Sequence, residues 1–145
     1  MTFRPLPPYI MASMDKLFIE ALPETKDIDG AKHWSADNGY FAQICYREEA
    51  RHIAYFTIKA GFSRGMHYHE KKDETFYVIS GRLRASFIDL DSGEKFDQVL
   101  TPGMRLRVRP RCWHAFYGLE DSSVVEYSPQ EYDKEDAYRM EADGV

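Results

Sequence analysis

The sequence has few cysteines and no long apolar segment. Cys45 and Cys112 are its only cysteines, which is too few for a disulfide framework, and they do not form a Cys-x-x-Cys pair. No apolar run approaches the roughly 20 residues that span a bilayer, and residues 1–5 lack the apolar core of a secretory signal. We therefore expect a cytoplasmic protein with reduced thiols and no membrane partner.

The chain also lacks an excess of positive charge, repeats and low-complexity segments. Its net charge is −5, with acidic and basic residues mixed, which gives no reason to expect nucleic acid as a partner. A hydrophobic content of 43% with 14% aromatic residues is typical of a folded globule. The length of 145 residues fits one domain.

Short strand-like runs dominate the chain after about residue 35. Residues 40–46 and 52–58 are aromatic and β-branched, and together they predict a hairpin. Residues 82–90 alternate apolar and polar side chains. Turn signals recur about every 8–12 residues, which favours a closed sandwich or barrel. Before this region, Pro5, Pro7 and Pro8 predict an extended arm, and residues 13–22 fit either a short helix or a strand.

A pair of histidines followed by a carboxylate is the most informative motif. His67 and His69 are separated by one residue, so in a strand both point to one face while Tyr68 points away. The polar residues 70–73 can turn the chain and bring Glu74 back to the same space. Two imidazoles and a carboxylate suit a divalent transition metal, and His114 offers a third imidazole farther along the chain.

With these residues the sequence resembles the cupin superfamily. The first cupin motif is Gly, five residues, His-x-His, three or four residues, Glu, six residues and Gly. Its spacing is met without a gap by Gly61, His67, His69, Glu74 and Gly81.

The second cupin motif is met in part. Gly103 and His114 hold its register. Arg109 stands at its proline position, Arg111 at its glycine position and Gly118 at its asparagine position. These departures keep the histidine ligand and affect the loop that precedes it.

The resemblance implies an all-β fold, a double-stranded β-helix or jelly-roll barrel. We expect an N-terminal arm over residues 1–35, the barrel over 36–129 and a short polar tail over 130–145. The arm carries apolar residues, which we expect to pack across a second subunit of a homodimer. The tail, with Arg139, Met140 and Glu141, loosely resembles the end of cupin-type mannose-6-phosphate isomerases, which favours carbohydrate substrates.

The resemblance also implies a metal centre made by His67, His69, Glu74 and His114. Three imidazoles and one carboxylate suit one divalent transition metal ion, which is Fe, Mn, Ni, Co or Zn. Four protein ligands on an octahedral ion leave about two positions open. We therefore expect a small, polar and anionic molecule that chelates through adjacent oxygens.

Three functions are consistent with such a centre. The first is a metal-dependent isomerase or epimerase of a small sugar or sugar acid. The second is a non-haem iron dioxygenase, and the third is a cupin that binds a metal or small molecule without catalysis. The fold alone does not choose among them.

Other residues near the motifs are weaker candidates. Glu70 and Tyr68 are candidates for a catalytic base in the isomerase. The sequence also suggests a group of substrate-pocket residues: Phe116, Arg105, Arg107 and Cys112. The alternative to a binding role is that the arginines face outward into solvent or a subunit contact and that the cysteine is a small buried apolar residue. His33 and His52 are interpreted as ordinary surface or core histidines.

Overall fold

The computed structural model describes residues 10–142. They form thirteen strands and one 3-10 helix, and no helix among them is long and apolar enough to cross a bilayer. The elements are β1 (Ile10–Met14), β2 (Leu17–Ala21), β3 (Lys32–Ala36), β4 (Gly39–Gln43), β5 (His52–Ile58), β6 (Ser63–Tyr68), β7 (Glu74–Ser80), β8 (Leu83–Asp89), β9 (Lys95–Leu100), β10 (Met104–Val108), β11 (Cys112–Gly118), β12 (Ser122–Ser128), the 3-10 helix η1 (Lys134–Asp136) and β13 (Tyr138–Arg139).

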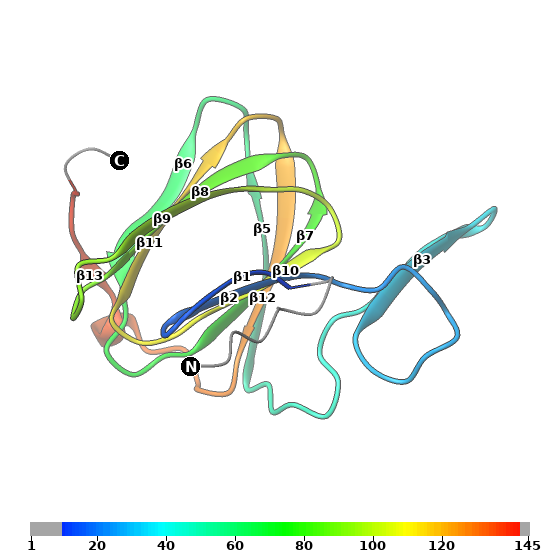
Figure 1. Cartoon of the computed structure of the whole chain (residues 1–145), viewed down its shortest axis with the longest axis horizontal. Helices are drawn as coiled ribbons and strands as arrows, with labels where there is room; N and C mark the ends of the chain where they lie inside the picture. The colour runs from blue at the N-terminus through cyan, green and yellow to red at the C-terminus, as the bar shows by residue number, and fades with distance from the viewer. Residues whose placement is uncertain (1–9, 143–145) are drawn as a thin grey trace, which may run out of the picture.

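Two antiparallel sheets make the barrel. The six-stranded sheet has the order β1-β2-β10-β7-β12-β5, and the five-stranded sheet has the order β13-β6-β11-β8-β9. Figure 1 shows the two sheets curving around a common interior. The predicted all-β jelly-roll barrel is therefore confirmed.

The main core lies between the sheets because their strands alternate inward apolar and outward polar residues. In β10, Leu106 and Val108 are buried, while Arg105 and Arg107 lie on the outer face with partial exposure. Phe87 and other side chains of the five-stranded sheet pack into the same apolar cluster. Burying each large apolar side chain contributes roughly 1.5–3 kcal/mol.

The first two strands correct the predicted N-terminal arm. β2 pairs along its length with β10, and β1 pairs with β2, so residues 10–21 belong to the six-stranded sheet. The strand alternative for residues 13–22 is the one the structure adopts, because Leu17 and Ile19 recur with period two and enter the core. Residues 1–9, with the three prolines of the predicted arm, lie outside the described residues.

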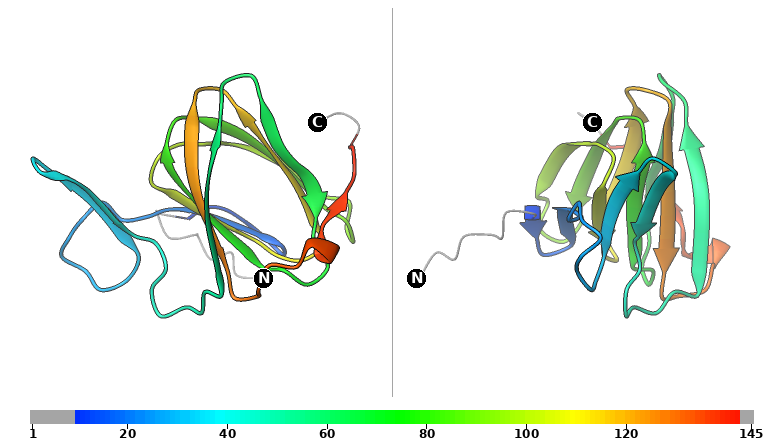
Figure 2. Two further views of the ribbon diagram at one scale, coloured as in Figure 1. Left: turned by 180° about the vertical axis from the view of Figure 1, so that it is seen from behind. Right: turned by 90° about the vertical axis from the view of Figure 1, so that its right-hand side faces the viewer.

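A two-stranded hairpin of β3 and β4 projects away from the barrel (Figures 1 and 2). The predicted pairing of residues 40–46 with 52–58 is therefore wrong, because β4 pairs with β3 while β5 pairs with β12. The chain after β4 contacts the outer face of the six-stranded sheet. There the Ile44 carbonyl accepts a hydrogen bond from Arg105 (2.6 Å), and Glu48 pairs with Arg107 (2.6 Å).

The described part of the tail, residues 130–142, returns to the barrel. β13 pairs with β6, with Tyr138 opposite Tyr68. Met140 packs with Trp113 and Ala115 in a second apolar cluster. The C-terminal segment therefore forms part of the wall near the motif histidines.

Candidate metal centre and pocket

A bulge in β6 directs the two motif histidines. His67 lies opposite His114 on β11, but the next pair along is Gly65 with Ala115, so Met66 is an extra residue. Met66 has a φ of 58°, and bulges of this kind re-aim neighbouring side chains. His67 and His69 then both line the interior cavity, with ring centroids 4.8 Å apart.

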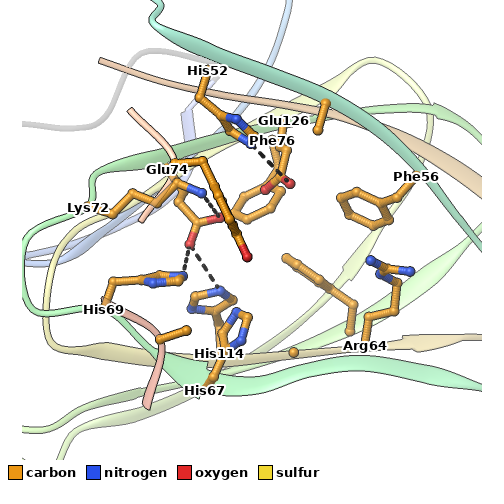
Figure 3. A pocket seen from close by; sticks show the side chains of 15 residues that line it. His52, Phe56, Arg64, His67, His69, Lys72, Glu74, Phe76, His114 and Glu126 are labelled. Carbon is orange, nitrogen blue, oxygen red and sulfur yellow. Dashed lines mark ion pairs between the residues drawn. The ribbon is translucent and has the colours of Figure 1, made fainter. Parts of the chain in front are cut away.

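The structure brings together the four side chains of the predicted metal centre. Their ligand atoms all lie within 4.8 Å of one another. In Figure 3, Glu74 lies above the three imidazoles. Its Oε1 is 2.5 Å from Nε2 of His69 and 3.6 Å from Nε2 of His114. His67 is half-buried and the other three are buried.

Backbone carbonyls fix the orientation of two of these rings. Nδ1 of His69 donates to the carbonyl oxygen of Asp136 (2.5 Å), and Nδ1 of His114 donates to that of Cys112 (3.0 Å). Each ring therefore presents Nε2 to Glu74, as ligating histidines do when the other nitrogen is hydrogen-bonded.

The converging atoms have no polar partner outside the tetrad. Nε2 of His69, Nε2 of His114 and Oε1 of Glu74 are buried, and among the described residues their polar contacts are with one another and do not have ordinary hydrogen-bond geometry. Leaving one such group unsatisfied costs about 1–3 kcal/mol. A divalent transition metal would satisfy all three at once, so the donor set fits the implied ion.

The four groups differ in their affinity for protons. Burial, with the neighbouring His114 and His69, lowers the pKa of His67 to about 3. Burial also lowers the pKa of His114. Burial opposes the charged form of His69, but contact with Glu74 outweighs it and raises the pKa of His69. Burial likewise opposes the charge on Glu74, but the two histidines outweigh it and lower the pKa of that carboxyl.

The tetrad forms one wall of a cavity of about 370 Å³, a size within the usual range for small-ligand sites. Phe56, Phe76 and Phe116 provide an apolar surface, and Lys72 and Arg64 add positive charge. Nζ of Lys72 is 3.9 Å from Glu74 Oε2, and the guanidinium of Arg64 lies over the Phe56 ring at 4.9 Å.

Across the cavity from the three imidazoles, an acid–base pair faces the tetrad (Figure 3). Nε2 of His52 on β5 is 3.9 Å from Oε1 of Glu126 on β12. Burial and the neighbouring Glu74 raise the pKa of Glu126 to about 7. Burial and the positive charge of Lys72 lower the pKa of His52. A carboxyl group with this pKa can take up and release a proton near neutral pH.

This pair was not recognised from the sequence. His52 was interpreted as an ordinary histidine, and Glu126 was not considered as a site residue. Glu126 lies two residues after the core residue Val124 on β12, so its side chain points to the same inward face. A charged residue at an inward-facing position of a strand was the feature of the sequence that could have identified it. Arg64 and Lys72, which also line the cavity, were missed as well.

Of the suggested pocket residues, Phe116 lines the cavity and three do not. Arg105 and Arg107 lie on the outer face of the six-stranded sheet, where Arg105 pairs with Glu20 and Arg107 with Glu48. They point outward because they alternate with the core residues of β10. Cys112 is packed in the core, and burial raises the pKa of its thiol to about 12.

The two candidate bases also lie outside the cavity lining. Glu70 pairs with Arg111 at 2.9 Å. The Tyr68 ring stacks on Tyr138, with centroids 5.2 Å apart. Strand alternation explains the position of Tyr68, which has the parity opposite to His67 in β6, whereas Glu70 lies beyond the end of β6.

Comparison with known proteins identifies the family. The family model of the cupin domain matches residues 54–128. The chain belongs to the cupin family. The match covers most of the barrel and all four residues of the tetrad.

One curated relative of this cupin is the UDP-2-acetamido-2,6-beta-L-arabino-hexul-4-ose reductase of Pseudomonas aeruginosa. The two are 27% identical over an alignment of 123 residues, and the match covers 81% of this chain and 33% of the reductase. The cupin chain therefore spans about a third of that relative's length.

Solved structures with the same fold include enzymes of keto-sugar chemistry. The dTDP-6-deoxy-D-glucose-3,5-epimerase of Legionella pneumophila has a TM-score of 0.71 at 15% identity, and the match covers 90% of this cupin and 76% of the epimerase. A 3,4-ketoisomerase of Helicobacter canadensis has a TM-score of 0.70 at 17% identity, covering 88% and 92% of the respective chains. At these identities the likeness shows the shared fold.

Proposed function

We propose that this cupin is a metal-dependent isomerase or epimerase that acts on a small keto sugar or sugar acid. The observation that carries the proposal is the arrangement of one cavity. The tetrad of three imidazoles and one carboxylate lies on one side, and the His52–Glu126 pair lies on the other. The activities named for the structural neighbours, sugar epimerases and ketoisomerases, agree with this reaction class.

The metal would be held by His67, His69, Glu74 and His114. When bound, a divalent transition ion acts as a Lewis acid on a carbonyl oxygen and makes the neighbouring C–H more acidic. Lys72 and Arg64 place positive charge near the same space, which suits an anionic substrate.

Glu126 is the proposed base. Its carboxylate takes the proton from the carbon next to the substrate carbonyl. The C–H electron pair then forms a C=C bond, and the carbonyl pair moves to oxygen to give an enolate. If the carbon that lost the proton carries a hydroxyl group, the proton of that hydroxyl moves to the former carbonyl oxygen and the proton held by Glu126 returns to the former carbonyl carbon, which gives the isomer. An epimer forms when a solvent water protonates the opposite face of the original carbon and the hydroxide left behind takes the proton from Glu126. His52, 3.9 Å from Glu126, stabilises the carboxylate and can relay the proton.

The proposal is tested by hydrogen exchange at carbon. Protein loaded with each candidate metal is incubated in D₂O with keto sugars, sugar phosphates, uronates and nucleotide-linked 4-keto sugars, and NMR follows the C–H groups beside each carbonyl. We expect deuterium at that carbon together with isomer or epimer formation. Oxygen consumption with Fe²⁺ in place of exchange would identify a dioxygenase. Binding that raises the melting temperature without any exchange or turnover would identify a binding protein.

A further inference from the structure

Asp136, in the 3-10 helix η1, joins the C-terminal segment to the loop that follows His69. Its side chain is buried, with 5% of the residue exposed. It accepts hydrogen bonds from three successive backbone N–H groups: those of Glu70 (2.9 Å), Lys71 (3.2 Å) and Lys72 (3.1 Å). Bonds to an ionised acceptor are stronger than neutral ones, so this carboxylate fixes the loop to η1.

The backbone of the same residue holds the His69 ring. The Asp136 carbonyl oxygen accepts from Nδ1 of His69 at 2.5 Å. A carbonyl oxygen has no proton to donate, so the Nδ1 proton is defined and Nε2 is left facing Glu74. Asp136 therefore contacts both the ring of His69 and the loop that begins next to it.

The rest of the C-terminal segment keeps η1 against the barrel. Before η1, Gln130 accepts a hydrogen bond from the backbone of Asp73 (3.0 Å). After η1, β13 pairs with β6, and the carbonyl of Met140 accepts from Nε1 of Trp113 (2.6 Å). In Figure 1 this segment lies beside the five-stranded sheet that carries His67 and His114. The site's loop is thus tied to a segment more than 60 residues away in sequence.

We propose that Asp136 is a positioning residue of the metal centre, which sets the orientation of His69 and the course of residues 70–72. This inference rests on the metal site of the proposed function. Removing the side chain releases the loop and lets the carbonyl move away from His69. The ligand set is unchanged, but one imidazole is no longer held in its ligating orientation.

The probe is Co²⁺ alone, because its visible absorption reports ligand geometry. Metal-free wild-type protein, Asp136→Ala and Asp136→Asn are titrated with Co²⁺. For Asp136→Ala we expect a Kd about 10- to 100-fold higher, the usual effect of losing an outer partner of a ligating histidine, with a changed d–d spectrum. Asp136→Asn keeps one accepting oxygen, so its Kd should rise less. In the metal-free variants, amide hydrogen exchange at residues 70–72 should become faster.

Glu135→Ala is the matched control. Glu135 is the exposed neighbour of Asp136 in the same 3-10 helix, so the variant removes an equal charge without touching the loop. Its Co²⁺ affinity, spectrum and amide exchange should match those of the wild type, and the metal-free melting temperature of every variant shows whether it folds.

Several results would overturn the proposal. One is a folded Asp136→Ala or Asp136→Asn protein that binds Co²⁺ with wild-type affinity and spectrum. Another is equal weakening in Glu135→Ala, which would indicate a general charge effect. Loss of folding in metal-free Asp136→Asn would assign the residue to global stability instead. Wild-type protein that takes up no Co²⁺ would remove the metal site itself, which separates failure of the proposed function from failure of this inference.

Discussion

Glu126 is a carboxyl group whose charged form is disfavoured by its surroundings but which also has a polar partner. Its position on β12 partly buries the side chain among the groups of the cavity, and this burial together with Glu74 raises its pKa to about 7. The imidazole of His52, 3.9 Å away, supplies a polar partner. At the scale of single residues, proton transfer in the proposed reaction depends on this carboxyl group.

Replacing Glu126 tests that dependence. Glu126→Gln should lower kcat by about 10²- to 10⁴-fold, the usual contribution of a general base, while KM and Co²⁺ affinity change little. Steady-state kinetics and a Co²⁺ titration measure both effects. Glu70→Gln is the informative comparison, because that carboxylate pairs with Arg111 outside the cavity lining. The assignment fails if Glu70→Gln loses activity and Glu126→Gln keeps it.

The protonation of His69 should make the affinity for Co²⁺ depend on pH. Contact with Glu74 outweighs burial and raises the pKa of His69 above its ordinary value of 6.5, whereas that of His67 is about 3. A raised pKa means that the free protein holds a proton which the metal must displace. Affinity for Co²⁺ should therefore fall as pH drops through the pKa of His69, with about one proton released per metal ion. Titrations in buffers of different pH, with proton release measured, check this slope, and an affinity that does not fall as the pH is lowered below 6.5, the ordinary histidine pKa, would contradict it.

Three residues of the tetrad could be proposed from the sequence because their spacing is local, whereas His114 was proposed from the resemblance to the second cupin motif. The period of a strand puts His67 and His69 on one face, and the short turn returns Glu74. Glu126 and His52 could not be placed in this way. They come from two strands far apart in sequence, and only the pairing of β12 with β5 brings them together. The arginines of β10 illustrate a different limit, because alternation defines two faces without saying which one is the interior.

At the scale of elements, the turn between β7 and β8 depends on Gly81. Its φ is 90°, and a Cβ there would lie 2.2 Å from Oγ of Ser122 and 2.4 Å from the carbonyl oxygen of Asp121. The glycine that ends the first cupin motif is thus needed both for its backbone conformation and for the close approach of the loop before β12.

Two alanine variants separate the contribution of backbone conformation from that of steric overlap. Gly93 also has a positive φ, 78°, but a Cβ there would meet nothing within 4 Å. Gly93→Ala should cost about 1–2 kcal/mol from backbone conformation alone, and Gly81→Ala should cost about 1–3 kcal/mol more because of the steric overlap. Urea unfolding measures both free energies. Equal losses in the two variants would contradict the steric part of the argument.

The strands themselves were largely visible in the sequence, but their partners were not. Residues 40–46 and 52–58 look like a hairpin because they are neighbours joined by a polar turn. The structure instead pairs β4 with β3 and β5 with β12. Residues 10–21 were assigned to the arm because proline-rich sequence precedes them, although a strand was one of the two alternatives for residues 13–22. Non-local pairing decides these cases, since β2 enters the sheet by pairing with β10.

At the scale of the whole molecule, association remains a prediction. Among the described residues, Ile53 and Tyr55 on the edge strand β5 are 68% and 63% exposed, and exposed apolar groups on a sheet edge favour contact with another chain. We expect a dimer at micromolar concentration, measured by light scattering. A variant lacking residues 1–9, which leaves β1 intact, should dissociate more readily if those residues cross to the second subunit. A monomeric mass for the full chain would contradict the prediction.

Metal content tests the central claim most directly. The wild-type protein is purified from its native host and analysed for metals beside the His67→Ala/His114→Ala double variant, prepared in the same way. We expect one divalent transition metal ion per wild-type chain and none in the double variant, which should remain folded because the apolar cluster between the sheets keeps all of its own side chains. A wild-type protein without metal, or a double variant that keeps a stoichiometric ion, would contradict the account.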